Sequence, residues 1–506
     1  AKLTKEDIVA FADKYLKEDN YAVVYKKQGK DPNEKKMTKP EITPIVSNRD
    51  VASPFLTSIQ ENAVKPIEPV FLDFKKDMSQ LTAKSDIPVL YKQNTTNDLF
   101  QLIYVFDMGN NNDKALGTAF DYLEYLGTSD MTPEELKSEF YRLACTFYVS
   151  PGNERTYVVL SGLNENMPAA MQLFEKLLAD AQVNKEAYNN LVGDILKARA
   201  DAKLNQGQNF SRLMNYAMYG PKSPATNLLT EAELASMNPQ ELVDRIHNQN
   251  NYKHRILYYG PSSSKDLLAT IEQYHQVPAT LKDIPAGNEY SYLETPATKV
   301  LVAPYEAKQI YMAQISNLDK KYDPAIEPTR ELYNEYFGGG MNSIVFQEIR
   351  ETRGLAYSAW ACIMPPSYLK YPYTIRTQIA TQNDKMIDAV NTFNDIINNM
   401  PESEAAFKLA KEGLINRMRT DRIIKSDIIW TYINAQDLGQ SVDPRIKLYN
   451  DVQTMTLKDI VDFQKEWVKG RTYVYCILGD KKDLDMNKLK AVGPIEELTQ
   501  EQIFGY

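Results

Sequence analysis

The sequence predicts an α+β protein with two tandem homologous domains, each a mostly antiparallel or mixed sheet with helices packed on one face. Three observations lead to this fold class. The chain has 506 residues, which is too long for one ordinary core. Strand-like and helix-like segments alternate along it, which is typical of mixed layers. One helix-then-strand signature also occurs three times, and such self-similarity indicates duplicated units.

The repeated signature is a helix start followed by a β-rich run. It reads TKEDIV at residues 4–9, NPQELV at 238–243 and TLKDIV at 456–461. Each copy places a small polar helix cap three residues before an acid, as in a capping box. Runs rich in β-branched and aromatic residues follow at 21–25, 255–259 and 472–478, and these are expected to form strands. Helix-then-strand therefore closes each unit.

The spacing of the signature gives the domain organisation. Residues 1–28 are expected to be the closing helix and strand of a preceding domain that is missing from this sequence. A proline-rich linker follows at 29–74, because such a composition favours an extended connection. The first complete domain is predicted at 75–280 and the second at 285–490, with a C-terminal tail at 491–506.

Within each domain, hydrophobic periodicity predicts the elements. In the first, strands are expected at 100–108 and 156–160, and helices at 114–126, 133–143 and 167–181. In the second, strands are expected at 299–303, 309–315 and 356–363, and helices at 326–337, 341–352 and 384–400.

Composition excludes several classes of function. Apolar residues make up 43% of the chain and charged residues 25%, and the net charge of −9 is spread along it. No basic stripe points to nucleic acid or an anionic membrane, and no apolar run is long enough for a membrane span. Cys145, Cys362 and Cys476 lie far apart, so they predict buried hydrophobic positions instead of a disulfide framework or a metal pair.

The most specific stretch is FGGGMNSIVFQEIRETRGLAYS, residues 337–358. Its three glycines, 338–340, permit positive φ and close backbone approach. Asn342 or Ser343 can cap a helix with an apolar face, and Gly354 can end it.

Arg350 lies in the last turn of that helix and Tyr357 on the strand that follows, so both side chains can point into the same space. A guanidinium beside a phenol is a strong donor pair for a peptide carbonyl or an oxyanion. Structural roles also remain open: the helix macrodipole favours a basic residue near a helix end, and a tyrosine at a strand start is often a core residue.

At these residues the sequence resembles the C-terminal domains of pitrilysin/insulinase-type zinc metallopeptidases, the inverzincins. The resemblance implies the C-terminal half of a long family member, which encloses and cleaves unfolded peptides. Arg350 and Tyr357 would then reach toward a zinc site in the N-terminal half and help to bind the scissile carbonyl. The same resemblance implies Zn²⁺ bound by that missing half, and a periplasmic, exported protein as in large bacterial members.

The family's zinc motif, His-x-x-Glu-His with a distal Glu, is absent from this sequence. The three histidines, His247, His254 and His275, do not form it. A second segment, DYLEYLGT at 121–128, resembles the motif helix with both histidines replaced. Asp121, Glu124 and Tyr125 take the motif positions in it, and Asp194 takes the place of the distal Glu. The first domain is thus predicted to be degenerate, with no metal in this chain and no hydrolysis by the chain alone.

Three functions remain open. The leading one is the non-zinc-binding half of a zinc metalloendopeptidase, with the zinc-bearing half in the same polypeptide. The chain could also be a non-catalytic peptidase-like subunit or scaffold, or a partner that supplies Arg350 and Tyr357 in trans to a separate zinc-bearing subunit. The closing helix expected at the start of the chain favours the fused arrangement.

Overall fold

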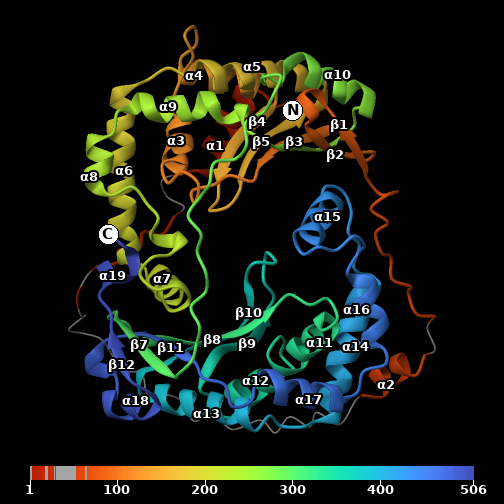
Figure 1. Ribbon diagram of the computed structural model, residues 1–506, viewed down its shortest axis with the longest axis vertical. Coiled ribbons are helices and arrows are strands. Elements are labelled where there is room, and N and C mark those ends of the chain that lie inside the picture. Colours follow the sequence, from red (N-terminus) through yellow and green to blue (C-terminus); the bar gives the residue numbers. More distant parts are fainter. Residues whose placement is uncertain (1–2, 18–20, 28, 30–52, 63–64) are drawn as a thin grey trace. The chain divides into compact units, whose positions relative to one another are not determined.

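Residues 67–506 contain two six-stranded sheets (Figure 1). The computed structural model describes residues 3–17, 21–27, 29, 53–62 and 65–506. These residues fall into two units, Ala1–Pro66 and Ile67–Tyr506, and both sheets belong to the second.

The first sheet mixes parallel and antiparallel pairs. Strand β6 lies between β2, with which it pairs in parallel, and β3, with which it is antiparallel. In spatial order the strands are β1 (Ser79–Thr82), β2 (Pro88–Gln93), β6 (Arg255–Gly260), β3 (Leu99–Phe106), β5 (Thr156–Leu163) and β4 (Cys145–Pro151).

The second sheet repeats this order. Strand β11 is parallel to β7 and antiparallel to β8, as β6 is to β2 and β3. Its strands are β12 (Ile495–Glu497), β7 (Lys299–Pro304), β11 (Val474–Gly479), β8 (Gln309–Lys321), β10 (Pro372–Gln382) and β9 (Ala356–Met364). The two sheets differ in one edge strand. In the first sheet this strand, β1, precedes its neighbour β2 in the chain, whereas in the second sheet it is β12, from the C-terminal tail. The predicted fold class, two tandem homologous α+β domains, is confirmed.

The helices follow the same duplicated order. Those associated with the first sheet are α3 (Leu116–Leu123), α4 (Pro133–Arg142), α5 (Met167–Asp180), α6 (Lys185–Lys203), α7 (Gln206–Tyr219), α8 (Glu231–Ser236), α9 (Pro239–Asn248) and α10 (Ser264–Tyr274). Those of the second part are α11 (Glu327–Phe337), α12 (Ile344–Phe346) with the π-helical η5 (Gln347–Thr352), α13 (Met386–Asn398), α14 (Glu404–Thr420), α15 (Asp427–Asp437), α16 (Arg445–Val452), α17 (Leu457–Trp467), α18 (Met486–Val492) and α19 (Gln500–Phe504). Each sheet has a large apolar core against its own helices.

The opposite face of each sheet is covered by a helix from the other domain, a layer that the sequence did not predict. Helix α7 packs Phe210 and Leu213 against β7, β8 and β11 of the second sheet. Helix α15 packs Ile429 and Ile433 against β2, β3, β5 and β6 of the first. Because successive strand residues point to opposite faces, both faces of each sheet are buried. This reciprocal exchange joins the two domains through apolar contacts.

A salt bridge and a ring contact fix the exchanged helix α15. The guanidinium of Arg155 makes a bidentate pair with Asp437 at 2.6 and 2.7 Å, and its Nε lies 2.6 Å from Asp107. Burial alone would lower the pKa of Arg155, but these hydrogen bonds outweigh burial and raise it. Trp430 of α15 packs edge-on against Tyr157 of β5. Helix α15 is thereby held against the first sheet by a polar contact at its last residue and an aromatic contact in its first half.

A buried polar network lies under the helical face of the first sheet. The Glu175 carboxylate accepts four hydrogen bonds: from Tyr104 at 2.8 Å, His275 Nδ1 at 2.6 Å, Asn250 at 3.0 Å and the backbone N–H of Gln276 at 3.0 Å. Four donors fill the acceptor positions of an ionised carboxylate.

The two histidines of this network are hydrogen-bonded to each other. His254 Nδ1 lies 2.8 Å from the Tyr252 carbonyl and so donates, and the Nε2 atoms of His254 and His275 lie 2.9 Å apart. Burial and the neighbouring His275 lower the pKa of His254, which favours its neutral ring. A neutral His254 that donates through Nδ1 accepts at Nε2, so His275 Nε2 is the donor between the two rings.

Helix α1 (Lys5–Tyr15) forms where the repeat predicts a closing helix. Its capping box, Thr4 with Asp7, matches the Thr456–Asp459 box of α17. The apolar residues of the two helices differ in environment, since Phe11 is 61% exposed whereas its counterpart Phe463 is 6% exposed. Helix α1 therefore matches α17 in its capping box, but its apolar side chains are exposed whereas those of α17 are buried.

The strand predicted at 21–25 does not form; these residues are described without strand pairing. The counterpart β11 pairs on both sides, and a single strand without neighbours is not stable. The predicted linker lies largely outside the described residues, but it includes a short helix, α2 (Pro54–Gln60). Residues Leu72 and Phe74, at its predicted end, are buried in the core around α15. No helix in the described part of the chain is long and apolar enough to span a membrane.

Candidate functional site

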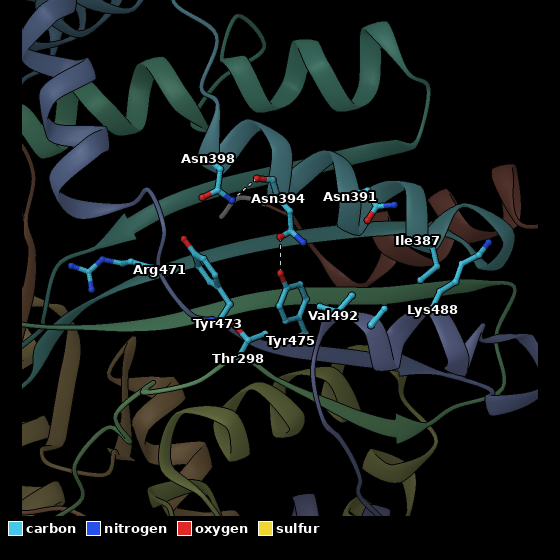
Figure 2. A pocket seen from close by; sticks show the side chains of 11 residues that line it. Thr298, Ile387, Asn391, Asn394, Asn398, Arg471, Tyr473, Tyr475, Lys488 and Val492 are labelled. Atoms are coloured by element: carbon cyan, nitrogen blue, oxygen red, sulfur yellow. Dashed lines mark hydrogen bonds between the residues drawn. The ribbon is translucent and has the colours of Figure 1, made fainter.

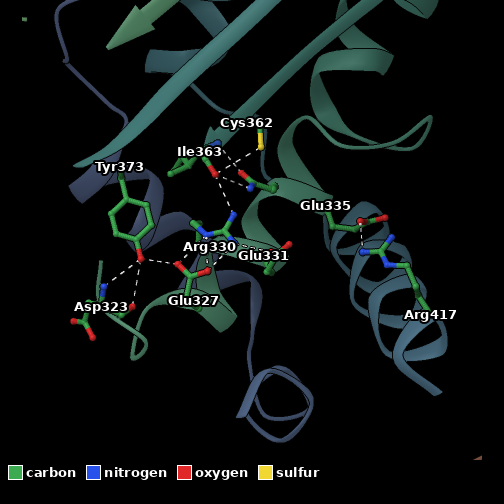
Figure 3. Close-up of polar contacts among 10 residues, drawn as sticks. Asp323, Glu327, Arg330, Glu331, Glu335, Cys362, Ile363, Tyr373 and Arg417 are labelled. Carbon is green, nitrogen blue, oxygen red and sulfur yellow. Dashed lines mark hydrogen bonds and ion pairs between the residues drawn. The ribbon is translucent and has the colours of Figure 1, made fainter. Parts of the chain in front are cut away.

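Strand β9, at the edge of the second sheet, is anchored by helix α11. The Asn334 side chain donates to the carbonyl of Ile363 at 3.0 Å and accepts from its N–H at 2.9 Å, in place of a neighbouring strand. Arg330 donates to the same carbonyl at 3.1 Å and is itself paired with Glu327 and Glu331 (Figure 3). The end of β9 is therefore fixed, and its beginning is left as the open part of the edge.

The glycine turn after α11 lets the backbone approach β9. A Cβ on Gly338 would lie 2.0 Å from the carbonyl oxygen of Ala361, so only glycine fits there. The predicted close approach is confirmed. The predicted positive φ is wrong, because φ of Gly338 is −140° and none of the three glycines lies in the left-handed region.

The helix predicted at 341–352 is present, but its second half is π-helical. Ser343 is the N-cap and accepts from the backbone of Phe346, as one of the two predicted candidates. After η5, Gly354 adopts φ +56° and turns the chain into β9. Isolated π-helical turns are frequent at functional sites. Here the wider turn contains Arg350.

Arg350 and Tyr357 lie in direct contact. The guanidinium carbon is 4.3 Å from the centroid of the Tyr357 ring, and Nη1 donates to the Tyr357 carbonyl at 3.1 Å. The guanidinium also lies 4.9 Å from the Phe346 ring centroid, and Nε is 3.5 Å from Glu351. Stacking on aromatic rings is a favourable setting for a guanidinium. The sequence thus placed the two side chains together correctly.

Tyr357 is not a core residue. Its side chain is 80% exposed, and the hydroxyl has no hydrogen-bond partner among the residues described here. A free phenol beside a cation can donate to a carbonyl oxygen or an oxyanion. The catalytic role of the pair stays a prediction, while the core interpretation of Tyr357 is wrong.

The degenerate zinc-motif residues lie on two helices of the first domain. Asp121 is on α3, and Glu124 and Tyr125 follow at its C-terminal end; Asp194 is exposed on α6. Burial and the neighbouring Glu124 raise the pKa of Asp121. In the described residues, no group of three or more His, Cys, Asp or Glu side chains could hold a metal ion.

The three histidines occupy structural positions. His254 and His275 are in the buried network with Glu175, and His247 Nε2 lies 3.1 Å from the Ala181 carbonyl. Cys145 and Cys476 are buried, as predicted, and Cys362 is half-buried.

We expect the chain, purified alone and dialysed, to hold no stoichiometric zinc and to leave unstructured peptides uncut. The carboxylates and tyrosine at the motif positions would make a weak oxygen-donor site without the imidazoles that zinc prefers. Metal analysis by inductively coupled plasma mass spectrometry checks the first point, and a fluorogenic peptide assay checks the second. One tightly held zinc per chain would contradict the interpretation of 121–128 as a degenerate motif.

Sequence reasoning missed two contributors to this site. Phe346 belongs to the apolar face of the predicted helix. It is half-buried, and its ring also contacts the Arg350 guanidinium. The Arg330, Glu327 and Tyr373 cluster, in which Tyr373 donates to Glu327 at 2.6 Å, fixes α11 (Figure 3). The i, i+3 spacing of Glu327 and Arg330 was a readable signal for an ion pair, but nothing in the sequence indicated burial.

Comparisons with known proteins place this chain beside peptidases. A family model described as "Peptidase M16 inactive domain" matches residues 255–414. An "Uncharacterized zinc protease" of Rickettsia felis is 22% identical over 263 residues, which cover 49% of this chain and 60% of that protein. The chain thus spans under two thirds of the length of that relative. A "Non-peptidase homolog YmxG" of Helicobacter pylori is 22% identical over 418 residues, covering 79% of this chain and 93% of that protein.

Solved structures share the fold. A peptidase M16 inactive domain from Pseudomonas fluorescens matches with a TM-score of 0.64 and 16% identity, over 80% of this chain and 98% of that one. The periplasmic protease PqqL from Escherichia coli matches with a TM-score of 0.62 and 14% identity, over 95% of this chain but 51% of that one. The family resemblance predicted from residues 337–358 is confirmed: residues 255–414 match the model of the peptidase M16 inactive domain, and the fold is that of the solved structures.

Proposed function

We propose that this chain, which carries a peptidase M16 inactive domain, acts as the non-zinc-binding half of a zinc metalloendopeptidase of the pitrilysin/insulinase type. Its role is to bind the scissile carbonyl of a peptide and to stabilise the transition state through Arg350 and Tyr357. The observation that carries the proposal is the contact between these two side chains, 4.3 Å from guanidinium to ring, on an open strand edge where the tyrosine is 80% exposed.

Tyr357 and Arg350 have different roles in this proposal. The Tyr357 hydroxyl donates a hydrogen bond to the carbonyl oxygen, and this bond strengthens as the oxygen gains negative charge. The Arg350 guanidinium supplies a positive charge that cannot be lost at working pH. Its contacts with the Phe346 and Tyr357 rings help to hold it in place. Zinc, held by the partner half, would activate water and polarise the same carbonyl.

Helix α1 supports a partner half that completes the site. Ile8, Phe11 and Tyr15 match Ile460, Phe463 and Trp467 of α17 in spacing. The α17 residues are buried and the α1 residues are exposed. Exposed apolar surface of this kind is typical of an interaction site. The partner that best fits the apolar face of α1 is a domain that lacks its own closing helix. The match of the chain to 51% of PqqL is consistent with a second half of similar size.

We expect peptide turnover only when this chain is combined with a zinc-bearing half supplied as a separate polypeptide. Neither half alone has both the metal and the Arg350–Tyr357 pair, so each should be inactive. A fluorogenic unstructured peptide gives the rate, and titration of the chain against the zinc-bearing half gives the stoichiometry of the active complex.

A matched pair of variants tests the docking of α1. Phe11→Ser should raise the concentration of chain needed for half-maximal activity, because an apolar contact is lost. Phe55→Ser, at an exposed phenylalanine of α2, should leave that concentration unchanged. Equal turnover by the zinc-bearing half with and without this chain would overturn the proposed function.

A non-catalytic role is the second candidate. The Helicobacter relative is described as a non-peptidase homolog. The match covers 93% of that protein and 79% of this chain. In a scaffold or assembly subunit, Arg350 and Tyr357 would contact a protein partner instead of a scissile peptide. The same reconstitution separates the two, because a scaffold would form a stable complex without adding peptide turnover.

A further inference from the structure

A polar cavity of about 480 Å³ lies between α13 and α18, over the helical face of the second sheet (Figure 2). Three asparagines of α13, Asn391, Asn394 and Asn398, lie along one side, and Figure 2 shows Arg471 and Lys488 toward its two ends. The sheet side carries the rings of Tyr473 and Tyr475, and the Tyr475 hydroxyl donates to Asn394 at 2.6 Å. None of the eleven lining residues is acidic.

The internal duplication supplies a matched comparison for this cavity. Helices α5 and α13 both follow a short turn after their strands and begin with Met167 and Met386, which pairs Glu175 with Asn394. Strands β6 and β11 are both six residues long and end in glycine, so the residues just before them, His254 and Tyr473, also correspond.

The polar contacts correspond as well. Tyr104 faces Ile256 in the first sheet and donates to Glu175 at 2.8 Å. At the equivalent place Gln314 faces Tyr475 and donates to Asn394 at 2.9 Å. The cavity is therefore the counterpart of the buried network of the first domain.

One side chain that fills the first site is missing from the second. In the first domain His275, the C-cap of α10, bonds to both Glu175 and His254. The C-cap of α18 is Gly493, which has no side chain. The Tyr473 hydroxyl, at the position equivalent to His254, is buried and has no hydrogen-bond partner within the described residues. The difference between His275 and Gly493 at these two C-caps thus accounts for both the open cavity and the unpaired Tyr473 hydroxyl.

The charges around the cavity favour an anion. Arg471 donates through Nε to the Trp467 carbonyl, and its Nη atoms have no partner in the described part of the chain. Burial lowers the pKa of Arg471, in keeping with a guanidinium that lacks a carboxylate partner. Glu466 pairs with Lys320 at 2.8 Å, outside the cavity, whereas Asp485 pairs with the lining residue Lys488 at 3.4 Å, so Arg471 is the cation available to a ligand. A guanidinium with free Nη groups binds planar or tetrahedral oxyanions well.

We propose that the cavity lined by Asn391, Asn394, Arg471 and Tyr473 is a binding site for a small ligand that enters through an oxyanion group, a carboxylate or a phosphate. The asparagine amides bind its other polar atoms. This site lies on the second domain apart from Arg350 and Tyr357, and its occupation does not depend on the proposed peptidase function.

The test is calorimetric titration of the whole chain with inorganic phosphate and, separately, with succinate, at constant ionic strength set by sodium chloride. We expect saturable binding of one ligand per chain by at least one probe, and the tighter probe identifies the oxyanion. Arg471→Gln should weaken that binding at least tenfold. Asn391→Ala removes an exposed amide that has no hydrogen-bond partner among the described residues, so it should weaken binding without affecting the fold.

The matched control is Arg422→Gln, which removes an exposed arginine outside the cavity. It should bind the probe as the unchanged chain does. Absence of saturable binding by both probes, or equal binding by all three variants, would overturn the proposal. A thermal unfolding scan of Arg471→Gln shows whether it folds, and Asn391→Ala keeps the test decisive if it does not.

Discussion

Tyr357→Phe should reduce kcat of the reconstituted peptidase by about 10²–10³-fold, since removal of one oxyanion donor typically costs roughly 3–4 kcal/mol of transition-state stabilisation. The substitution removes only a hydroxyl that has no partner among the described residues, on a side chain that is 80% exposed. The thermal midpoint and the zinc content should therefore stay unchanged. Steady-state kinetics with a fluorogenic peptide measure the effect, and KM should change less than kcat because the donor acts mainly in the transition state.

Two further variants sharpen this test. Tyr148→Phe removes the hydroxyl of a partly exposed tyrosine on β4, the corresponding edge strand of the first sheet, and should leave kcat unchanged. Arg350→Lys keeps the positive charge but loses the planar fork and its stacking, so activity should fall well below that of the unchanged protein. If Tyr357→Phe turns over peptide at the normal rate, the catalytic assignment is wrong and the scaffold function is favoured.

The sequence allowed the tandem architecture to be predicted because the duplication is carried by local signals. The capping boxes at Thr4 and Thr456 are set by residues three apart, and β-branched runs mark the closing strands. The contact between Arg350 and Tyr357 could be predicted for the same reason, since only a single turn at Gly354 separates their elements.

Long-range features were not predictable in this way. The apolar face of α15 gives no indication that it packs on the sheet of the other domain, because an amphipathic helix is compatible with any apolar surface. The run at 21–25 has the composition of a strand, yet a strand also needs a neighbour to pair with. The Glu175 network likewise joins residues about 100 positions apart, such as His275, and sequence spacing does not reveal such contacts.

The buried network of the first domain is therefore a feature that only the structure reveals, and it should matter greatly for stability. Glu175 and His275 are fully buried, with side chains 0% exposed. Replacing the carboxylate leaves buried donors without an acceptor, and each such group costs about 1–3 kcal/mol. In Glu175→Gln the new amide would also direct its N–H groups toward other donors, Asn250 and the backbone of Gln276.

We expect Glu175→Gln to lower the free energy of unfolding of the first sheet by about 2–6 kcal/mol, because two buried donors lose their acceptor at about 1–3 kcal/mol each. Native-state hydrogen exchange on peptides from β3 and β6 measures it, because those strands border the network and exchange reports local stability. Glu186→Gln on α6, an exposed glutamate of the neighbouring helix, is the matched control and should change stability by no more than about 0.5 kcal/mol. Amides of the second sheet should keep their protection from exchange in this variant, since that sheet has Asn394 at the position equivalent to Glu175 and its contacts are unchanged. Equal protection of β3 and β6 in Glu175→Gln and in the unchanged chain would mean that the hydrogen bonds to the Glu175 carboxylate do not stabilise the first sheet.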